Sequence, residues 1–138
     1  MEGDNVALTL SGDLTNGVDD NGDTGLISAL GSAIDSLQLT VAGWFNNNGG
    51  ALQTRAETAT VSANQIDNSG EIIHSGTGQL YVTSTDSLTN SGRIIGNGDI
   101  VASVSDLDNT DGVLTSIDGG LDLTVANAVT NTDGTIES

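Results

Sequence analysis

Three oxygen-bearing side chains alternate along one short segment of the chain: Asp19, Asn21 and Asp23. Calcium loops place carboxylate and amide oxygens at positions 1, 3 and 5 in this way. The later positions differ, because Thr24 stands where such a loop has glycine and Leu30 where it has a bidentate glutamate. The segment therefore predicts either a calcium site completed by backbone and water oxygens, or a solvated turn rich in Asp, Asn and Gly. No other cofactor is expected.

The chain has one tryptophan and one histidine, and both are expected on strands. Trp44 precedes an apolar core position, so alternation points its ring outward, where an exposed indole can serve as a platform for a sugar. The alternative is that Trp44 covers the base of a neighbouring loop. His74 lies between Ile73 and Ser75 and is expected to face outward. With a single histidine and no cysteine, a zinc site is not expected.

Carboxylates are plentiful, and a pair of them in a groove can perform the acid and base steps of polysaccharide cleavage. Lyases on β-helices also need a basic residue, and this chain has only Arg55 and Arg93 and no lysine. Surface turns explain the carboxylates that come near one another in the sequence, which are Asp106, Asp108, Asp111, Asp118 and Asp122. We therefore expect no enzyme, and keep a polysaccharide-acting β-helix enzyme as a remote alternative.

The charge of the chain argues against two classes of partner. Its 138 residues include 19 acidic and 2 basic ones, which gives a formal net charge of -17. Nucleic acids and anionic membranes are bound through clusters of Lys and Arg, so neither is an expected partner. No apolar run reaches the roughly 18 residues of a membrane span, so direct insertion is not expected. Residues 1 to 5 lack the basic start of a signal peptide, so an exported protein would be expected to contain this chain as one piece.

A ten-residue pattern recurs along the chain, as in IDNSGEIIHS at residues 66 to 75 and LTNSGRIIGN at residues 88 to 97. An apolar residue stands two positions before an Asn, and in most copies a Gly follows the Asn by two or three positions. A second apolar residue is expected five positions after the Asn, and these residues are Leu52, Ile73, Ile95, Leu114 and Ile136. The repeated Asn residues are separated by 31, 21, 22, 19 and 22 positions, and they are Asn16, Asn47, Asn68, Asn90, Asn109 and Asn131. Alternating apolar residues upstream of the Asn predict a short strand.

A unit of about 21 residues with two or three short strands is too small to bury its own apolar face. Stacked units bury that face against one another, and equivalent residues then form ladders about 4.8 Å apart. Asn suits the turn and can donate its amide to the next Asn in the stack. The sequence therefore predicts an all-β fold, a right-handed parallel β-helix (β-solenoid) of about six coils with internal Asn and aliphatic ladders. An ordinary β-sandwich is the alternative, but it gives no reason for an Asn at one fixed offset in every unit.

The whole chain, residues 1 to 138, is expected to form one solenoid segment. Its first repeat is about ten residues longer than the others, and the excess lies in residues 17 to 36. These residues are expected to leave the stack as a loop between coils 1 and 2. Within the loop, the apolar residues of LISALGSAI, at 26 to 34, have a spacing that allows one helical turn.

The pattern apolar-x-Asn-x-Gly-(Gly)-x-Ile after an alternating strand resembles the filamentous haemagglutinin-type repeat. FNNNGGAL at 45 to 52, IDNSGEII at 66 to 73 and LDNTDGVL at 107 to 114 carry the resemblance best. That family comprises very large bacterial exoproteins exported by two-partner secretion, among them adhesins and contact-dependent growth-inhibition proteins. The resemblance implies a right-handed β-helix in the stalk of a surface filament, and it carries over no catalytic residue.

The resulting functional prediction is a stalk segment of a large secreted adhesin-type exoprotein of the bacterial cell surface, a rigid spacer that presents a distal tip. The alternative is an adhesive segment that binds a cell-surface glycan or protein through residues 17 to 36 and Trp44. The other expected partners are neighbouring coils of the parent chain, or a second copy in end-to-end self-association, because open strand edges can pair.

Overall fold

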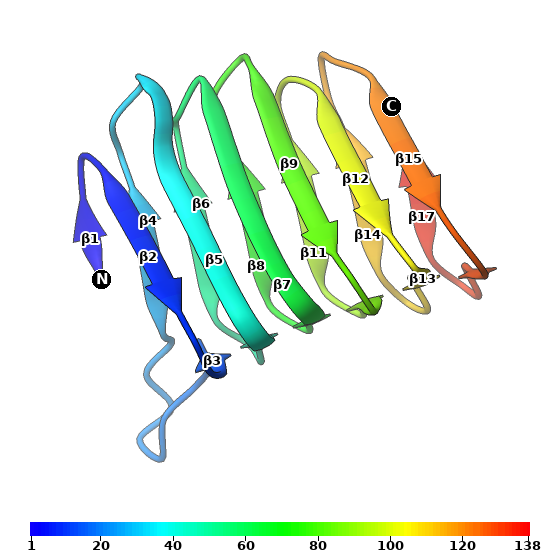
Figure 1. Cartoon of the computed structure of the whole chain (residues 1–138), viewed down its shortest axis with the longest axis horizontal. Helices are drawn as coiled ribbons and strands as arrows, with labels where there is room; N and C mark the ends of the chain where they lie inside the picture. The colour runs from blue at the N-terminus through cyan, green and yellow to red at the C-terminus, as the bar shows by residue number, and fades with distance from the viewer.

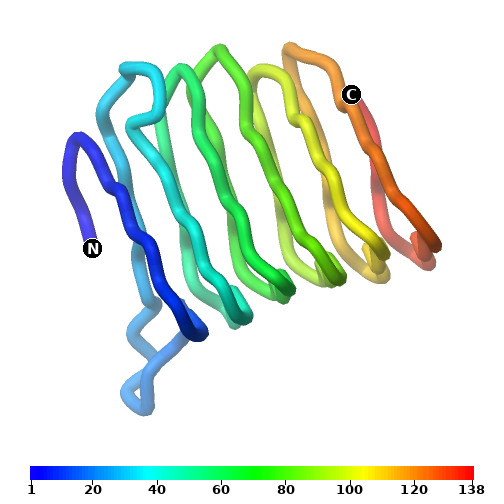
Figure 2. The backbone as a smooth tube through the Cα atoms, viewed as in Figure 1, coloured from blue at the N-terminus to red at the C-terminus, as the bar shows by residue number.

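The computed structural model describes residues 1–138 as an all-β structure without helices. About six coils of roughly 22 residues are stacked along one axis, and the two termini lie at opposite ends of the stack (Figures 1 and 2). The prediction of a parallel β-solenoid is therefore confirmed. No helix long and apolar enough to cross a membrane is present.

Two parallel sheets form the walls of the stack, with sheet B in front of sheet A in Figure 1. In strand order, sheet A contains β1 (Glu2–Gly3), β4 (Leu26–Ala29), β6 (Ala51–Thr54), β8 (Glu71–His74), β11 (Arg93–Gly96), β14 (Val113–Ser116) and β17 (Thr135–Glu137). Sheet B contains β2 (Val6–Leu10), β3 (Leu14–Thr15), β5 (Ile34–Asn47), β7 (Thr58–Asn68), β9 (Gln79–Ser84), β10 (Ser87–Asn90), β12 (Ile100–Val104), β13 (Asp106–Asp108), β15 (Leu121–Val125) and β16 (Val129–Thr130). Each coil thus runs along sheet B, turns, and returns along sheet A.

The space between the sheets is filled by side chains that stack on equivalent side chains of the next coil. Phe45 lies between Leu14 and Ile66 in the ladder that precedes the Asn, as the repeat predicts. Fully buried members of the core have no exposed surface, as for Phe45 and Ile66 at 0 %. The inner side chains of one coil are covered by those of the neighbouring coils, so the stacking of coils is what buries the apolar surface.

The six repeated Asn residues form a second, polar ladder at the corner where sheet B ends. Each of the first five donates one amide hydrogen to the Oδ1 of the next Asn, at 2.6–2.8 Å. The other amide hydrogen goes to the carbonyl of the first residue of the next coil's sheet A strand, at 3.0–3.2 Å. The first five Asn side chains are buried, so both bonds replace lost water contacts. The ladder fixes the corner of one coil to the corner of the next.

Glycine follows the Asn because the turns of successive coils touch. A Cβ built on Gly70 would lie 2.1 Å from the carbonyl oxygen of Gly50, and one on Gly92 would lie 2.2 Å from that of Gly70. Any side chain at these positions would push the stacked turns apart. Close backbone approach therefore accounts for glycine here.

The predicted aliphatic ladder of sheet A is wrong by one residue in two coils. Leu52 pairs with Ile72, and Ile72 pairs with Ile94, so these residues point inward and are fully buried. Ile73 and Ile95 point outward and are half-buried. The cause is the turn after Asn68 and Asn90, which is one residue shorter than the turn after Asn47.

The predicted insertion is also smaller than residues 17 to 36. Leu26–Ala29 form β4, in register with β6, and Ile27 and Ala29 are buried. The predicted helical turn at 26 to 34 is wrong, because the apolar residues extend the existing ladders instead. Residues 17 to 25 do leave the stack, and in Figure 1 they project from its N-terminal end. This loop is joined to the next turn by an antiparallel bridge between Gly17 and Gly49.

Replacement of Asn68 by alanine is expected to lower the free energy of unfolding by about 2–4 kcal/mol. The change removes both donated bonds of Asn68 and the acceptor that Asn47 uses. Urea unfolding followed by circular dichroism measures the difference. Asn46→Ala is the matched control, since this half-buried amide on the outer face has no hydrogen-bond partner, and its effect is expected to stay within about 0.5 kcal/mol. Equal losses for the two variants would contradict the role of the ladder.

Candidate functional site

The surface residues that follow Trp44 lie together on the outer side of β5. Phe45 and Asn47 point inward and are fully buried, so alternation places Trp44, Asn46 and Asn48 on the opposite face. Trp44 is 49 % exposed, which confirms its predicted outward orientation. Sugar binding by its ring stays a prediction.

The backbone at Trp44 is held by the preceding coil. Its N–H donates to Oδ1 of Asp13 at 2.8 Å. The Asp13 carboxylate approaches so closely that a Cβ on Gly43 would lie 2.0 Å from the same oxygen. Gly43 therefore makes room for the bond that positions Trp44.

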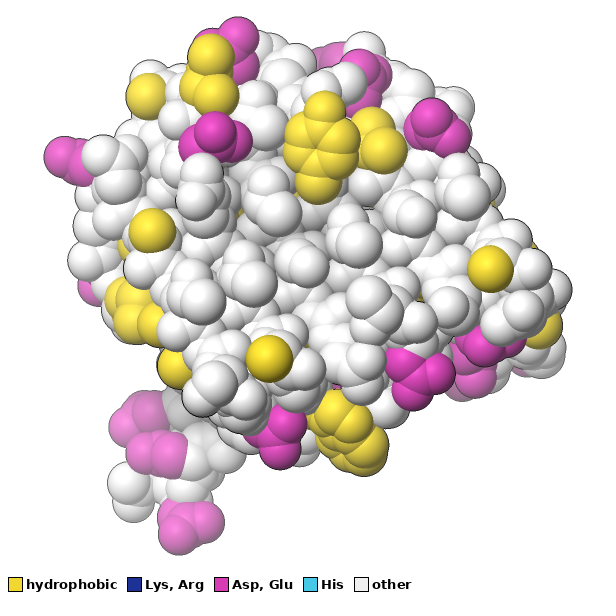
Figure 3. Space-filling model, viewed as in Figure 1, with side chains coloured by type: hydrophobic (Ala, Val, Ile, Leu, Met, Phe, Trp, Pro, Cys, Tyr) yellow, Lys and Arg dark blue, Asp and Glu magenta, His cyan; other side chains and the backbone are white.

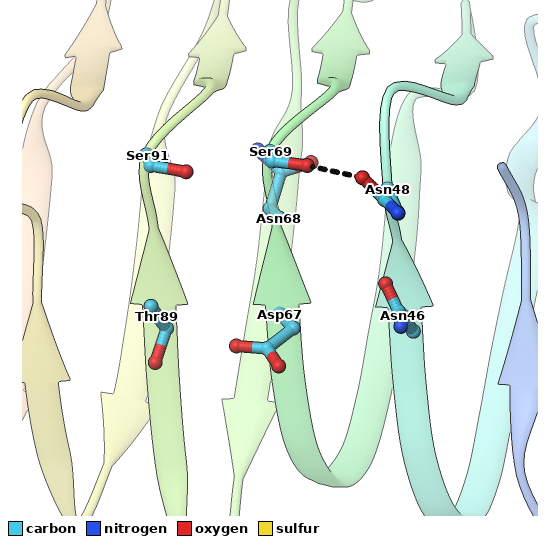
Figure 4. A pocket seen from close by; sticks show the side chains of 7 residues that line it. All are labelled: Asn46, Asn48, Asp67, Asn68, Ser69, Thr89 and Ser91. Carbon is cyan, nitrogen blue, oxygen red and sulfur yellow. Dashed lines mark hydrogen bonds between the residues drawn. The ribbon is translucent and has the colours of Figure 1, made fainter. Parts of the chain in front are cut away.

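A groove without any hydrophobic lining begins two residues beyond Trp44, and we call it the polar groove. Its walls are two rows of outward side chains that cross three coils (Figure 4), with Asn68 of the internal ladder between them. One row is Asn46, Asp67 and Thr89, and the other is Asn48, Ser69 and Ser91. Ser69 donates its hydroxyl to Oδ1 of Asn48 at 3.1 Å.

The chemistry of the polar groove is that of hydrogen bonding to a neutral polar ligand. Amides and hydroxyls both donate and accept, and the single carboxylate, Asp67, accepts. The in-register pairs Asn46 with Asp67 and Asp67 with Thr89 keep equivalent groups one strand separation apart. Such a surface offers regularly spaced partners to a chain of hydroxyl groups, with the exposed Trp44 ring near one end.

The loop of residues 17 to 25 reaches the same end of the groove as Trp44, on the side of Asn48. Gly17 lies against the backbone of Asn48, where a Cβ would be 3.2 Å from the Asn48 carbonyl oxygen. Asn48 lies four positions after Trp44 along β5 and the turn after it, or about 13 Å of extended chain. The structure thus brings the loop and Trp44, which the sequence proposed together, to the two sides of the same end of one groove.

The predicted calcium ligands of this loop are engaged with one another. Oδ1 of Asp19 accepts the backbone N–H of Asn21 and of Asp23, each at 2.9 Å, and Oδ2 accepts the Asn21 amide at 3.4 Å. These bonds stabilise the ionised carboxylate, so the pKa of Asp19 lies below its usual value. No group of three His, Cys, Asp or Glu side chains that could hold a metal is present. Calcium binding at the loop stays a prediction.

His74 does not face outward as predicted, because the shorter turn after Asn68 shifts it to an inward position. It pairs with Thr54 on one side and Gly96 on the other, and it is 1 % exposed. Nε2 lies 2.8 Å from the carbonyl oxygen of Ala56, and Nδ1 has no partner. The neutral ring with its proton on Nε2 fits this pocket. Burial lowers the pKa of His74, although the Ala56 carbonyl acts in the opposite direction.

The carboxylates considered for catalysis lie on different parts of the stack. Asp106 and Asp108 are on β13, whereas Asp122 is on β15. Asp106 accepts the backbone N–H of Ala128 in the next coil at 3.2 Å. The hydroxyl and backbone N–H of Thr110 donate to Asp108 and lower its pKa, which favours the ionised form over that of a general acid.

Comparison with models of known protein families, with curated proteins and with solved structures finds no match to this chain.

Sequence reasoning missed the polar groove, although the sequence held a signal for it. The residues immediately before and after each ladder Asn must point outward when the Asn points inward. In coils 2 to 4 all of these flanking residues are polar, and they are Asn46, Asn48, Asp67, Ser69, Thr89 and Ser91.

The stability of the protein is expected to fall as the pH is lowered from about 6.5, the ordinary value for a histidine. His74 has a lowered pKa when folded, so the unfolded chain binds the proton first. The free energy of unfolding keeps its full value above the pKa of His74 in the unfolded chain. It decreases as the pH falls from there toward the pKa of His74 in the folded chain, by at most about 1.4 kcal/mol per pH unit. Urea unfolding between about pH 5 and pH 7.5 measures it.

His74→Thr is the matched variant, because Thr54 holds the same ladder position in the neighbouring coil. The variant should lose the pH dependence in this window, whatever its stability at neutral pH. The lowered pKa values of Asp19 and Asp108 affect the pH dependence of stability only below about pH 4, outside this window. An unchanged slope in His74→Thr would show that another group is responsible.

Proposed function

We propose that this chain is a rigid spacer, a stalk segment of a large secreted adhesin-type exoprotein of the bacterial surface. The observation that carries the proposal is the unbroken Asn ladder, which joins every coil to the next through two amide hydrogen bonds. A stack joined in this way holds its two ends at a fixed separation. The resemblance of the repeat to the filamentous haemagglutinin type supports the secreted, cell-surface setting.

The charge supports a spacer as well. The net charge of -17 gives repulsion between chains and keeps an extended rod soluble. In Figure 3 acidic side chains lie around the margins of the sheet B face and on the projecting loop, and no Lys or Arg side chain is visible in this view.

The rigidity is measured directly by the distance between two spin labels on one row of outward residues. Thr9 and Thr124 belong to a row of Thr and Ser that crosses all six coils of sheet B, so five strand separations divide them. The chain has no cysteine, so Thr9→Cys/Thr124→Cys can be labelled cleanly. We expect one narrow distance near 24 Å plus the label arms, unchanged from low to high salt. A broad distribution that contracts with salt, as in a flexible charged chain, would refute the spacer.

A second function, glycan binding, is favoured by one specific observation: Trp44 is half exposed near one end of the polar groove. An aromatic plate beside hydroxyl and amide groups is the arrangement that sugars require.

Binding of the labelled chain to a glycan array, with calcium and with a chelator, tests this second function. A glycan-binding segment would give specific binding that Trp44→Ala reduces at least about tenfold, with Thr83→Ala on the same sheet as the control. Signal that survives Trp44→Ala would place the contact elsewhere. Absence of binding in both conditions would leave the spacer alone.

A further inference from the structure

The outer face of sheet A differs from the rest of the surface. It carries both arginines of the chain: Arg93 lies on β11, and Arg55 follows β6 directly. Between β4 and β17 the acidic residues of the strands are Glu71 and Glu137, so this part of the face, which excludes Glu2 on β1, has zero charge in a chain of net charge -17. Two copies can therefore meet on this part of the face without strong repulsion.

Aliphatic side chains occupy the middle of the same face. Ile73 and Ile95 are adjacent in register, and both are half-buried on the outside of the sheet. Ile117, in the turn after β14, is 60 % exposed. Large contiguous apolar patches mark interaction sites, and these isoleucines supply the apolar part of a contact whose remainder is polar.

The face also has a hollow near its N-terminal side. Leu30 and Ile73 form its apolar part, and Arg55 stands beside them. The complete lining is Leu30, Gln53, Thr54, Arg55, Ile73 and Ser75. Arg55 has no carboxylate within ion-pair distance, unlike Arg93, which lies 3.3 Å from Glu71.

We propose that the outer face of sheet A is a self-association surface, on which a second copy of this chain packs with its stack running in the opposite direction. The two-fold axis lies in the contact, parallel to the strands, between β8 and β11. It places β8 of one copy over β11 of the other, and β6 over β14. The outer face of sheet A is complementary to itself under this two-fold rotation, and for that reason we assign the contact to a second copy of the chain.

The register of sheet A gives the pairs that face one another across the axis. The central isoleucines meet each other, acid meets base, and no like charges are opposed. The opposed pairs are Ala51 with Val113, Glu71 with Arg93, Gln53 with Thr115, Ile73 with Ile95, and Ser75 with Asn97. The exposed Ile117 of each copy is brought opposite Arg55, beside the hollow of the other copy.

The size of the face is sufficient for such a contact. Six strands about 4.8 Å apart, each with about three outward rows, cover on the order of 500 Å² per copy, or about 1,000 Å² in total. That area reaches the lower end of specific interfaces. Because the contact is isologous, association stops at two copies, whereas end-to-end pairing of coils continues to longer species.

Sedimentation velocity of the 138-residue chain, from about 10 µM to about 1 mM, tests the proposal. We expect a monomer–dimer equilibrium that shifts toward dimer as salt screens the repulsion between the other surfaces. Ile95→Glu should weaken dimerisation at least about tenfold, because it places a charge in the middle of the contact. Thr83→Glu adds the same charge to the outside of sheet B and should change it less than about twofold.

Charge reversal tests the direction of the second copy. Glu71→Arg and Arg93→Glu alone should each weaken the dimer, since each opposes like charges across the axis. The double variant restores opposite charges within and between copies, so it should recover most of the dimerisation. Circular dichroism checks that all variants keep the fold.

Three results would overturn the proposal. A strict monomer at every concentration and salt would leave this face to a different protein or to solvent. Equal weakening by Ile95→Glu and Thr83→Glu would show an effect of net charge alone. Association that continues beyond two copies would assign it to the ends of the stack. None of these results bears on the rigidity that defines the proposed spacer.

Discussion

The buried amide ladder is the interaction on which the rest of the structure depends. Apolar contacts are non-directional and tolerate sliding, so hydrogen bonds must hold the corners of the stack in place. Backbone bonds between the turns contribute, such as that from the N–H of Gly70 to the carbonyl of Asn47 at 2.9 Å. The Asn side chain supplies direction: one hydrogen goes to the next Asn and the other to the backbone where the next sheet A strand begins. The same two bonds recur in five successive coils, so the corner is built by repetition. Apolar ladders on either side then fall into register.

This corner explains how one chain accommodates turns of unequal length. Successive ladder residues are separated by 31, 21, 22, 19 and 22 positions, yet every pair is within hydrogen-bond distance. The extra residues of the first interval are accommodated in the loop of residues 17 to 25, and strand β4 still joins sheet A. Variation is absorbed outside the ladder, and the ladder itself is constant.

The sequence predicted the parts of the fold that keep a fixed offset from the Asn. Leu14, Phe45 and Ile66 stand two positions before it, and they form the ladder that was expected. The side chains after the turn were harder, because a turn shorter by one residue exchanges the inner and outer faces of the following strand. That single cause placed Ile73 in the core by prediction and His74 outside, when the structure has the reverse. Pairing between coils decides the register there, and no local pattern reports it.

The candidate sites also divide into features that neighbouring residues determine and features that pairing between coils determines. The outward orientation of Trp44 comes from its neighbour Phe45, so the sequence was sufficient. The polar groove and the neutral face of sheet A combine residues from several coils, about 20 positions apart in the chain. Their composition is visible only once the register is known. In a periodic fold, each row of surface residues therefore takes one residue from every coil, and these residues are about one repeat apart in the sequence.

The amide ladder has a further consequence, because every bond in it points the same way. Nδ2 of each Asn donates toward the C-terminal side, and Oδ1 accepts from the N-terminal side. The column of amides therefore has a direction along the axis of the stack, and aligned hydrogen bonds of this kind polarise one another. Stacks can be continued through the ladder only with donor end to acceptor end. Two like ends brought together would set donor against donor or acceptor against acceptor. The two ends of the stack are therefore chemically different, and only unlike ends are complementary.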